Sequence, residues 1–139
     1  MNAMMKPSLN DISDAWFAFH RAHDEIGDYT HRADAGEEFF WVIEYLGDTA
    51  RHEPQTCWDA ISLIWSRTDK NDMARLASLA AGPLEDLLAY HGREVSPWVK
   101  QLCLSEPVFR TLLQGVWQNA ILPDVWERIN ELRNSGGEA

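Results

Sequence analysis

The placement of proline is the feature that most limits how this chain can fold. Five of the six prolines lie at or near the expected start of a helical segment: Pro54, Pro83, Pro97, Pro107 and Pro123. Proline fits the first turn of a helix, where its missing N–H would have no partner, but it disrupts a helix interior. The segments between these prolines are short, so we expect about eight short helices.

Apolar residues within these segments recur at helical spacing. Ile12, Trp16 and Phe19 fall on one stripe of a helix expected over residues 10–25. No run shows sustained alternation of apolar and polar residues, and no Asn-Gly or Asp-Gly hairpin pair occurs. We therefore expect an all-α fold, either a compact bundle or a short stack of helical hairpins.

The length of 139 residues suggests a single all-α domain over residues 1–139. Residues 1–9 and 134–139 lie at the two ends of the chain, and we expect them to be frayed.

The block SLAAGPLEDLLAYHG, Ser78–Gly92, has helical spacing but carries a Gly-Pro pair in its middle. We expect Gly82 to end one helix in a left-handed conformation and Pro83 to begin the next. Glu85 and Asp86 then fall in the first turn, where the helix dipole favours acids. The final glycine of the block is expected to end the second helix. The block therefore predicts a tight corner between two helices.

This block, together with EPVFRTLLQGVW (Glu106–Trp117), resembles a family of small uncharacterised all-helical bacterial proteins. The stretch AWFAFHRA in the first half is loosely similar as well. The resemblance implies a helical fold and a bacterial or phage source. It implies no activity and no catalytic residues.

The charge is negative and unevenly distributed. The formal net charge is −10, and residues 1–70 carry 13 acids and 6 bases (−7) against 9 acids and 6 bases (−3) in residues 71–139. An acidic surface repels nucleic acid and attracts basic protein surfaces, although acidity also serves solubility alone. Basic residues are scattered singly and no phosphate-binding glycine loop occurs, so neither nucleic-acid binding nor nucleotide binding is expected.

The two cysteines, Cys57 and Cys103, lie inside helical apolar patterns and lack a CxxC partner. We expect reduced core residues in a cytoplasmic protein, although a disulfide between them stays open. No stretch approaches the length of a membrane span, and the first residues lack the apolar region of a signal peptide. No cofactor and no membrane contact are expected.

The first half combines acids with a run of aromatic residues. Phe39, Phe40 and Trp41 are consecutive, so on a helix they span about 200° of its circumference. Either this helix is buried on two sides or one aromatic is exposed. Exposed aromatics among acids suit a basic protein partner. The expected partner-binding residues are Asp24, Glu25, Asp28, Glu37, Glu38, Trp41 and Glu44.

These features favour a small acidic protein that binds and inhibits a protein partner and is not an enzyme. The preferred role is an immunity protein that neutralises a toxin, and one alternative is a phage inhibitor of a host defence complex, in the manner of an anti-CRISPR protein. The other alternative is a metal-dependent enzyme, since histidine and carboxylate side chains gather in HRAHDEIGDYTH. Its ligands would be His20, His23, Asp24, Asp28 and His31.

Overall fold

The computed structural model describes residues 6–25 and 37–135, and within them the chain is all-α without strands. The elements are α1 (Leu9–Glu25), the 3-10 turn η1 (Glu37–Phe39), α3 (Trp41–His52), α4 (Pro54–Arg67), α5 (Met73–Leu79), the π-helical turn η2 (Ala80–Leu84), α6 (Glu85–Ser105), α7 (Phe109–Leu113) and α8 (Pro123–Ser135). The all-α prediction is confirmed. Helix α1 begins inside the expected frayed end 1–9, and α8 ends inside 134–139.

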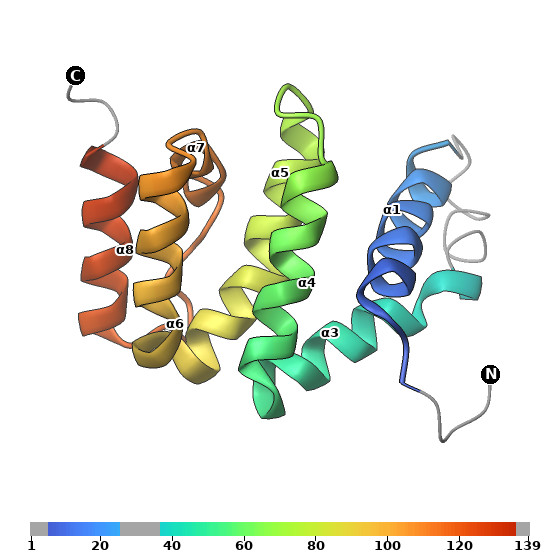
Figure 1. The fold of residues 1–139 in the computed structure, drawn as a ribbon, viewed down its shortest axis with the longest axis horizontal. Coiled ribbons are helices and arrows are strands. Elements are labelled where there is room, and N and C mark those ends of the chain that lie inside the picture. Colours follow the sequence, from blue (N-terminus) through green and yellow to red (C-terminus); the bar gives the residue numbers. More distant parts are fainter. Residues whose placement is uncertain (1–5, 26–36, 136–139) are drawn as a thin grey trace.

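The elements follow one another along the long axis of the molecule (Figure 1). Helices α1 and α3 form one end, α4 and α5 lie in the middle, and α6, α7 and α8 form the other end. Helix α4 contacts α1, α3 and α6, so it joins the two ends. No helix among the described residues is long and apolar enough to cross a membrane.

The core is built from the apolar faces that the helical spacing predicts. Trp16 of α1, Ile61 and Trp65 of α4, and Phe109 of α7 are fully buried. The Trp65 ring meets the Phe109 ring edge-on at 4.9 Å between centroids, a favoured aromatic geometry. Cys57 and Cys103 are both buried and free in the structure, which confirms their assignment to the core.

Local sequence features account for the starts of two helices. Before α1, Ser8 Oγ accepts a hydrogen bond from the Asp11 N–H and Asp11 Oδ2 accepts one from the Ser8 N–H, each at 3.0 Å. This reciprocal pair satisfies two amide donors that a helix start leaves unpaired. Pro54 lies in the first turn of α4, as its position in the sequence predicts.

The prediction of a corner at Gly82-Pro83 is wrong. Helices α5 and α6 are continuous through η2, and no glycine in the described part of the chain has a positive φ. A residue with a Cβ atom is disfavoured in helical conformation before proline, and Gly82 avoids that clash. Pro83 has no N–H and its ring crowds the carbonyl four residues back, so the turn widens. The Glu85 N–H accordingly reaches the Ala80 carbonyl five residues back.

The second expected stop, at Gly92, coincides with a kink one residue earlier, where two helical segments of α6 meet. The backbone kinks at His91 (φ −137°, ψ 34°), but α6 continues through Pro97 to Ser105. The two expected helices on either side of Gly82-Pro83 are therefore one continuous path up to this kink, and the next helical segment begins before Pro97 and not at it. The expected number of eight is accordingly too high. Gly92 lets α8 approach closely, because a Cβ atom there would lie 2.6 Å from Val125 Cγ1.

Candidate functional site

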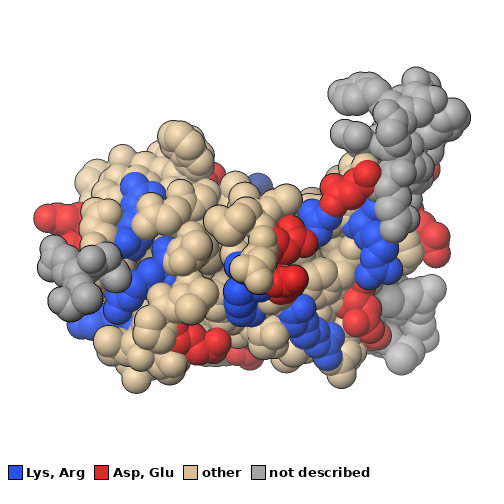
Figure 2. All heavy atoms as spheres, turned by 90° about the horizontal axis from the view of Figure 1, so that it is seen from above, with Lys and Arg blue, Asp and Glu red and all other residues tan. Residues whose placement is uncertain are grey.

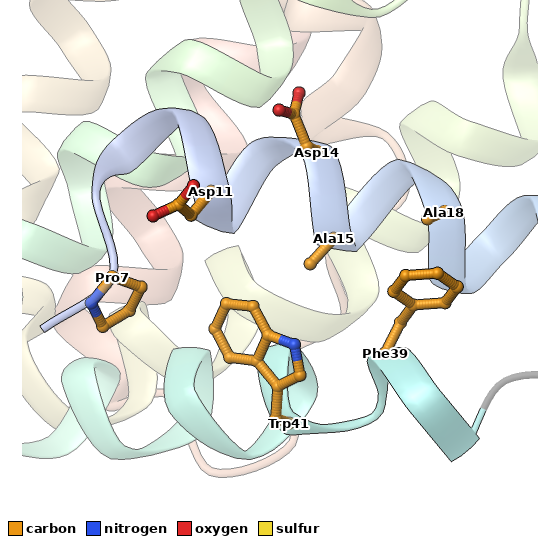
Figure 3. A pocket seen from close by; sticks show the side chains of 7 residues that line it. All are labelled: Pro7, Asp11, Asp14, Ala15, Ala18, Phe39 and Trp41. Atoms are coloured by element: carbon orange, nitrogen blue, oxygen red, sulfur yellow. The ribbon is translucent and has the colours of Figure 1, made fainter. Parts of the chain in front are cut away.

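An apolar groove of about 590 Å³ lies between α1 and the η1–α3 segment. We call it the α1–α3 groove, and its lining residues are Pro7, Asp11, Asp14, Ala15, Ala18, Phe39 and Trp41. Figure 3 shows the Phe39 and Trp41 rings projecting from the η1–α3 side toward α1. Because Ala15 and Ala18 are three residues apart, they share a face of α1, and their small side chains leave the groove open.

The three consecutive aromatic side chains at positions 39–41 lie in two different environments. Phe39 and Trp41 are half-buried against the core and line the groove, whereas the Phe40 side chain is 45% exposed. Of the two alternatives for this run, the structure therefore supports an exposed aromatic. Trp41, the predicted partner-binding aromatic, borders the groove and is partly accessible.

Acidic side chains lie around this groove, and α1 contributes two of them. Asp11 is exposed and caps α1, and Asp14 lies 3.5 Å from Arg67 in an exposed ion pair. The predicted Glu37 and Glu38 are exposed in η1, next to Phe39. The groove therefore combines an apolar floor with exposed carboxylates.

The acidity does not cover the whole molecule. On the face shown in Figure 2, Lys and Arg side chains are interspersed with Asp and Glu. This face is therefore not uniformly acidic, despite the net charge of −10.

The remaining predicted partner-binding residues do not gather at the groove. Asp24 forms an ion pair with Arg75 of α5, and Glu44 lines a different hollow between α3 and α6. Asp28 lies outside the described residues, as does the side chain of Glu25. Trp41 thus lines the groove together with Phe39, which follows Glu37 and Glu38 in η1. Asp24 and Glu44 lie elsewhere, in contact with Arg75 and in the hollow between α3 and α6.

The histidines of α1 are engaged in packing. The His20 ring lies 4.4 Å from the Trp16 ring, and burial, assisted by Arg75 and His23, lowers the pKa of His20 to about 4. His23 Nδ1 lies 3.1 Å from the Phe19 carbonyl oxygen. Within residues 6–25 and 37–135, no group of three His, Cys, Asp or Glu side chains is placed to hold a metal ion. Asp28 and His31 of the metal alternative lie outside the described residues.

A second hollow, of about 310 Å³, was missed by the sequence reasoning. Glu44, Asp48 and Arg51 line it from α3, and Asp86 and Tyr90 line it from α6. The Asp86–Tyr90 pair, four residues apart, indicated a shared helix face, but nothing in the sequence places that face beside α3.

Glu85 has a role that the sequence did not reveal. Its carboxylate accepts hydrogen bonds from the Trp117 N–H at 2.9 Å and from Asn119 Nδ2 at 2.8 Å. It was expected to complement a helix start, yet it holds the loop before α8. Because this loop is more than 30 residues away along the chain, no local pattern predicts the contact.

The fold is all-α, and an accessible apolar groove lies between α1 and the η1–α3 segment. The sequence matches a family of unknown function (DUF6869) over residues 30–137, and the chain belongs to that family. No curated protein and no solved structure matches the chain. The match includes Phe39 and Trp41 on one side of the groove, whereas Asp11 to Ala18 on the other side precede it.

Proposed function

We propose that this protein binds another protein through the α1–α3 groove. The observation that carries the proposal is the pairing of a half-buried Trp41 with an apolar groove large enough to take a side chain from a partner. Buried aromatic anchors dominate the binding energy of protein interfaces. The exposed carboxylates of Glu37, Glu38 and Asp14 would select a partner with basic residues around its apolar anchor.

The proposed biological role is inhibition of that partner, with an immunity protein acting on a toxin as the preferred form. The net charge of −10 supports it, because association with a basic protein is accelerated by opposite charge. Inhibition of a host defence complex by a phage protein requires the same kind of surface and is the alternative.

The test begins by isolating the partner with the full chain from source cells and purifying both proteins. The dissociation constant is then measured for Trp41→Ala and for Trp117→Ala. Trp117 is 69% exposed in the loop before α8 and serves as the matched control. We expect Trp41→Ala to weaken binding by about 30-fold, corresponding to a hot-spot loss of about 2 kcal/mol, and Trp117→Ala to have little effect.

Charge reversal tests the acidic part of the site separately. The double variant Glu37→Lys/Glu38→Lys should weaken binding mainly through slower association, and added salt should reduce the difference. The control is Glu127→Lys on α8, an exposed acid remote from the groove in sequence. Equal affinity for the wild type and for both groove variants would rule out this groove as the contact site.

A further inference from the structure

A small cavity lies where α1, α3, η2 and α6 meet. It measures about 130 Å³, and we call it the inner cavity. The residues that matter here are Trp16, His20, Gly47, Pro83 and Asp86. Gly47 and Asp86 also line the hollow of Glu44, Asp48, Arg51 and Tyr90, which we call the outer hollow. The two spaces therefore adjoin, with Gly47 and Asp86 at their junction.

Gly47 has no evident role in forming the fold. It lies inside α3, its φ is not positive, and an added Cβ atom would meet no atom within 4 Å. Glycine is an unfavourable residue in a helix interior compared with alanine. The space that a side chain would take is the junction of the inner cavity and the outer hollow, so glycine keeps this junction open.

Two further features belong to the same cavity. Its wall includes the π turn at Gly82 and Pro83, and π turns inside helices occur frequently at functional sites. Trp16, which also lines it, is fully buried, and its indole N–H has no hydrogen-bond acceptor among the described residues.

We propose that the inner cavity and the outer hollow together bind a small primary amine, with its apolar body in the inner cavity and its ammonium group beside Asp86. Ile43 and Leu46 join Trp16 and Pro83 in an apolar wall for the body of the ligand. This site is separate from the α1–α3 groove and does not depend on the function proposed for that groove.

The charges around the junction favour a cation. Among the residues that line the outer hollow, the carboxylates of Glu44, Asp48 and Asp86 outnumber the one guanidinium, that of Arg51. This guanidinium lies 5.2 Å from the centre of the Tyr90 ring. Burial, together with the negative charge of Glu85, raises the pKa of Asp86, so its charged form is less favourable than in water. A bound ammonium group would stabilise that charged form. His20 is uncharged at neutral pH, since its pKa is lowered to about 4, and does not repel a cation.

The size of the cavity limits the ligand. An apolar cavity of roughly 150 Å³ takes up benzene, which has about six heavy atoms. The inner cavity, at about 130 Å³, is of similar size. Isoamylamine is a suitable probe, because its branched apolar body ends in a single ammonium group. Isoamyl alcohol has the same body with a neutral group, and isovalerate has the same five-carbon skeleton with its end carbon as an anionic carboxylate.

The first experiment titrates each probe into the ¹⁵N-labelled full chain and follows the Trp16 indole and Gly47 amide signals by NMR. We expect saturable shifts with isoamylamine at millimolar concentration, binding of isoamyl alcohol about tenfold weaker, and no binding of isovalerate. Equal affinity for the amine and the alcohol would overturn the assignment of the ammonium group to Asp86. Shifts that avoid Trp16 and Gly47 would overturn the location.

Variants then separate the two parts of the site. Gly47→Leu should abolish amine binding while the protein stays folded, because space is open at that position. Asp86→Asn should remove the preference for amine over alcohol, whereas Glu127→Gln on α8 should keep it. Trp41→Ala should leave amine binding unchanged, since the groove is a separate site. Undiminished amine binding by folded Gly47→Leu would refute the proposal.

Discussion

The two ends of the molecule are held together in different ways. At the end formed by α6, α7 and α8, polar side chains bridge separate elements: Arg93 Nε lies 3.0 Å from Asp124 Oδ2, and Arg110 Nη1 donates to the Leu132 carbonyl at 2.7 Å. At the other end, no hydrogen bond or ion pair joins the described residues of α1 to those of α3, and the groove lies between them. The polar contacts of α1 run to α4 and α5 instead, from Asp14 to Arg67 and from Asp24 to Arg75. Side chains thus bridge the elements of the α6–α8 end, whereas the groove between α1 and α3 stays open.

Gly92 and Gly47 show the same contrast between a closely packed contact and an open space. At Gly92 an added Cβ atom would collide with Val125 of α8, whereas at Gly47 it would meet nothing within 4 Å. The first glycine allows two helices to pack closely. The second, Gly47, lies beside a space that no other side chain fills. Substitutions at these two positions should therefore change stability in opposite directions.

The largest effect is expected for Gly92→Ala. The new methyl group overpacks the contact with buried Val125 and should destabilise the protein by about 3 kcal/mol. Urea unfolding followed by circular dichroism measures this change. In the double variant with Val125→Ala the two losses should be less than additive, because the removed methyl groups make room. Additive losses would show that the Gly92 contact is not the cause.

The next effect is expected for Glu85→Ala. This change removes the carboxylate that binds the Trp117 N–H and the Asn119 amide, and it should cost about 2 kcal/mol. Faster hydrogen exchange of the Trp117 backbone amide, followed by NMR, would report a loosened loop, because this N–H loses its acceptor. Glu85→Gln retains a carbonyl acceptor, so its loss of stability should be smaller than that of Glu85→Ala. Equal losses for both variants would mean that the loop is held by other contacts.

The groove end should lose stability in mild acid through His20. Its pKa is lowered from 6.5 to about 4 in the folded protein, so the unfolded chain binds more protons between these pH values. The stability that His20 contributes is complete above about pH 6.5 and falls as the pH drops toward 4. After allowance for solvent screening, the loss is on the order of 1 kcal/mol. The difference in pH dependence between wild type and His20→Gln measures it.

The control for this pH effect is His52→Gln, which changes an exposed histidine in the last turn of α3. It should leave the pH dependence of unfolding close to that of the wild type. If His20→Gln behaves in the same way, burial of His20 does not contribute to acid sensitivity.

The smallest effect is expected for Gly47→Ala, and its sign is opposite. Alanine is favoured over glycine in a helix interior, and the added methyl group meets no atom, so stability should increase by about 0.5–1 kcal/mol. Thermal unfolding measures the increase. A lower melting temperature would show that the fold does require glycine at this position.

Much of the fold was predictable because its causes are local. The position of Pro54 indicated the start of α4, and the spacing of Ile61 and Trp65 indicated its buried face. The Gly-Pro pair was misread, because the residue types that end a helix are the same ones that allow a wider turn within it. Distinguishing the two outcomes requires knowing whether the helices on both sides are held in line by packing.

Less of the candidate site was predictable. The sequence identified Trp41, Glu37 and Glu38 as a possible contact surface, and the structure places Trp41 and Phe39 on one groove. It did not identify Ala15 and Ala18, which form the opposite wall, because small residues on a helix face are common in any core. Their importance depends on which helix lies opposite.

The sequence by itself determined the helical class, the positions of most helix starts, the buried aromatic faces and the negative charge. Each of these follows from interactions within one or two helical turns. Only the tertiary structure decided that Glu85 holds a loop far along the chain, that Gly82-Pro83 lies within a continuous helix, and that two glycines have opposite packing. These outcomes depend on contacts between distant segments, which the order of residues alone does not specify.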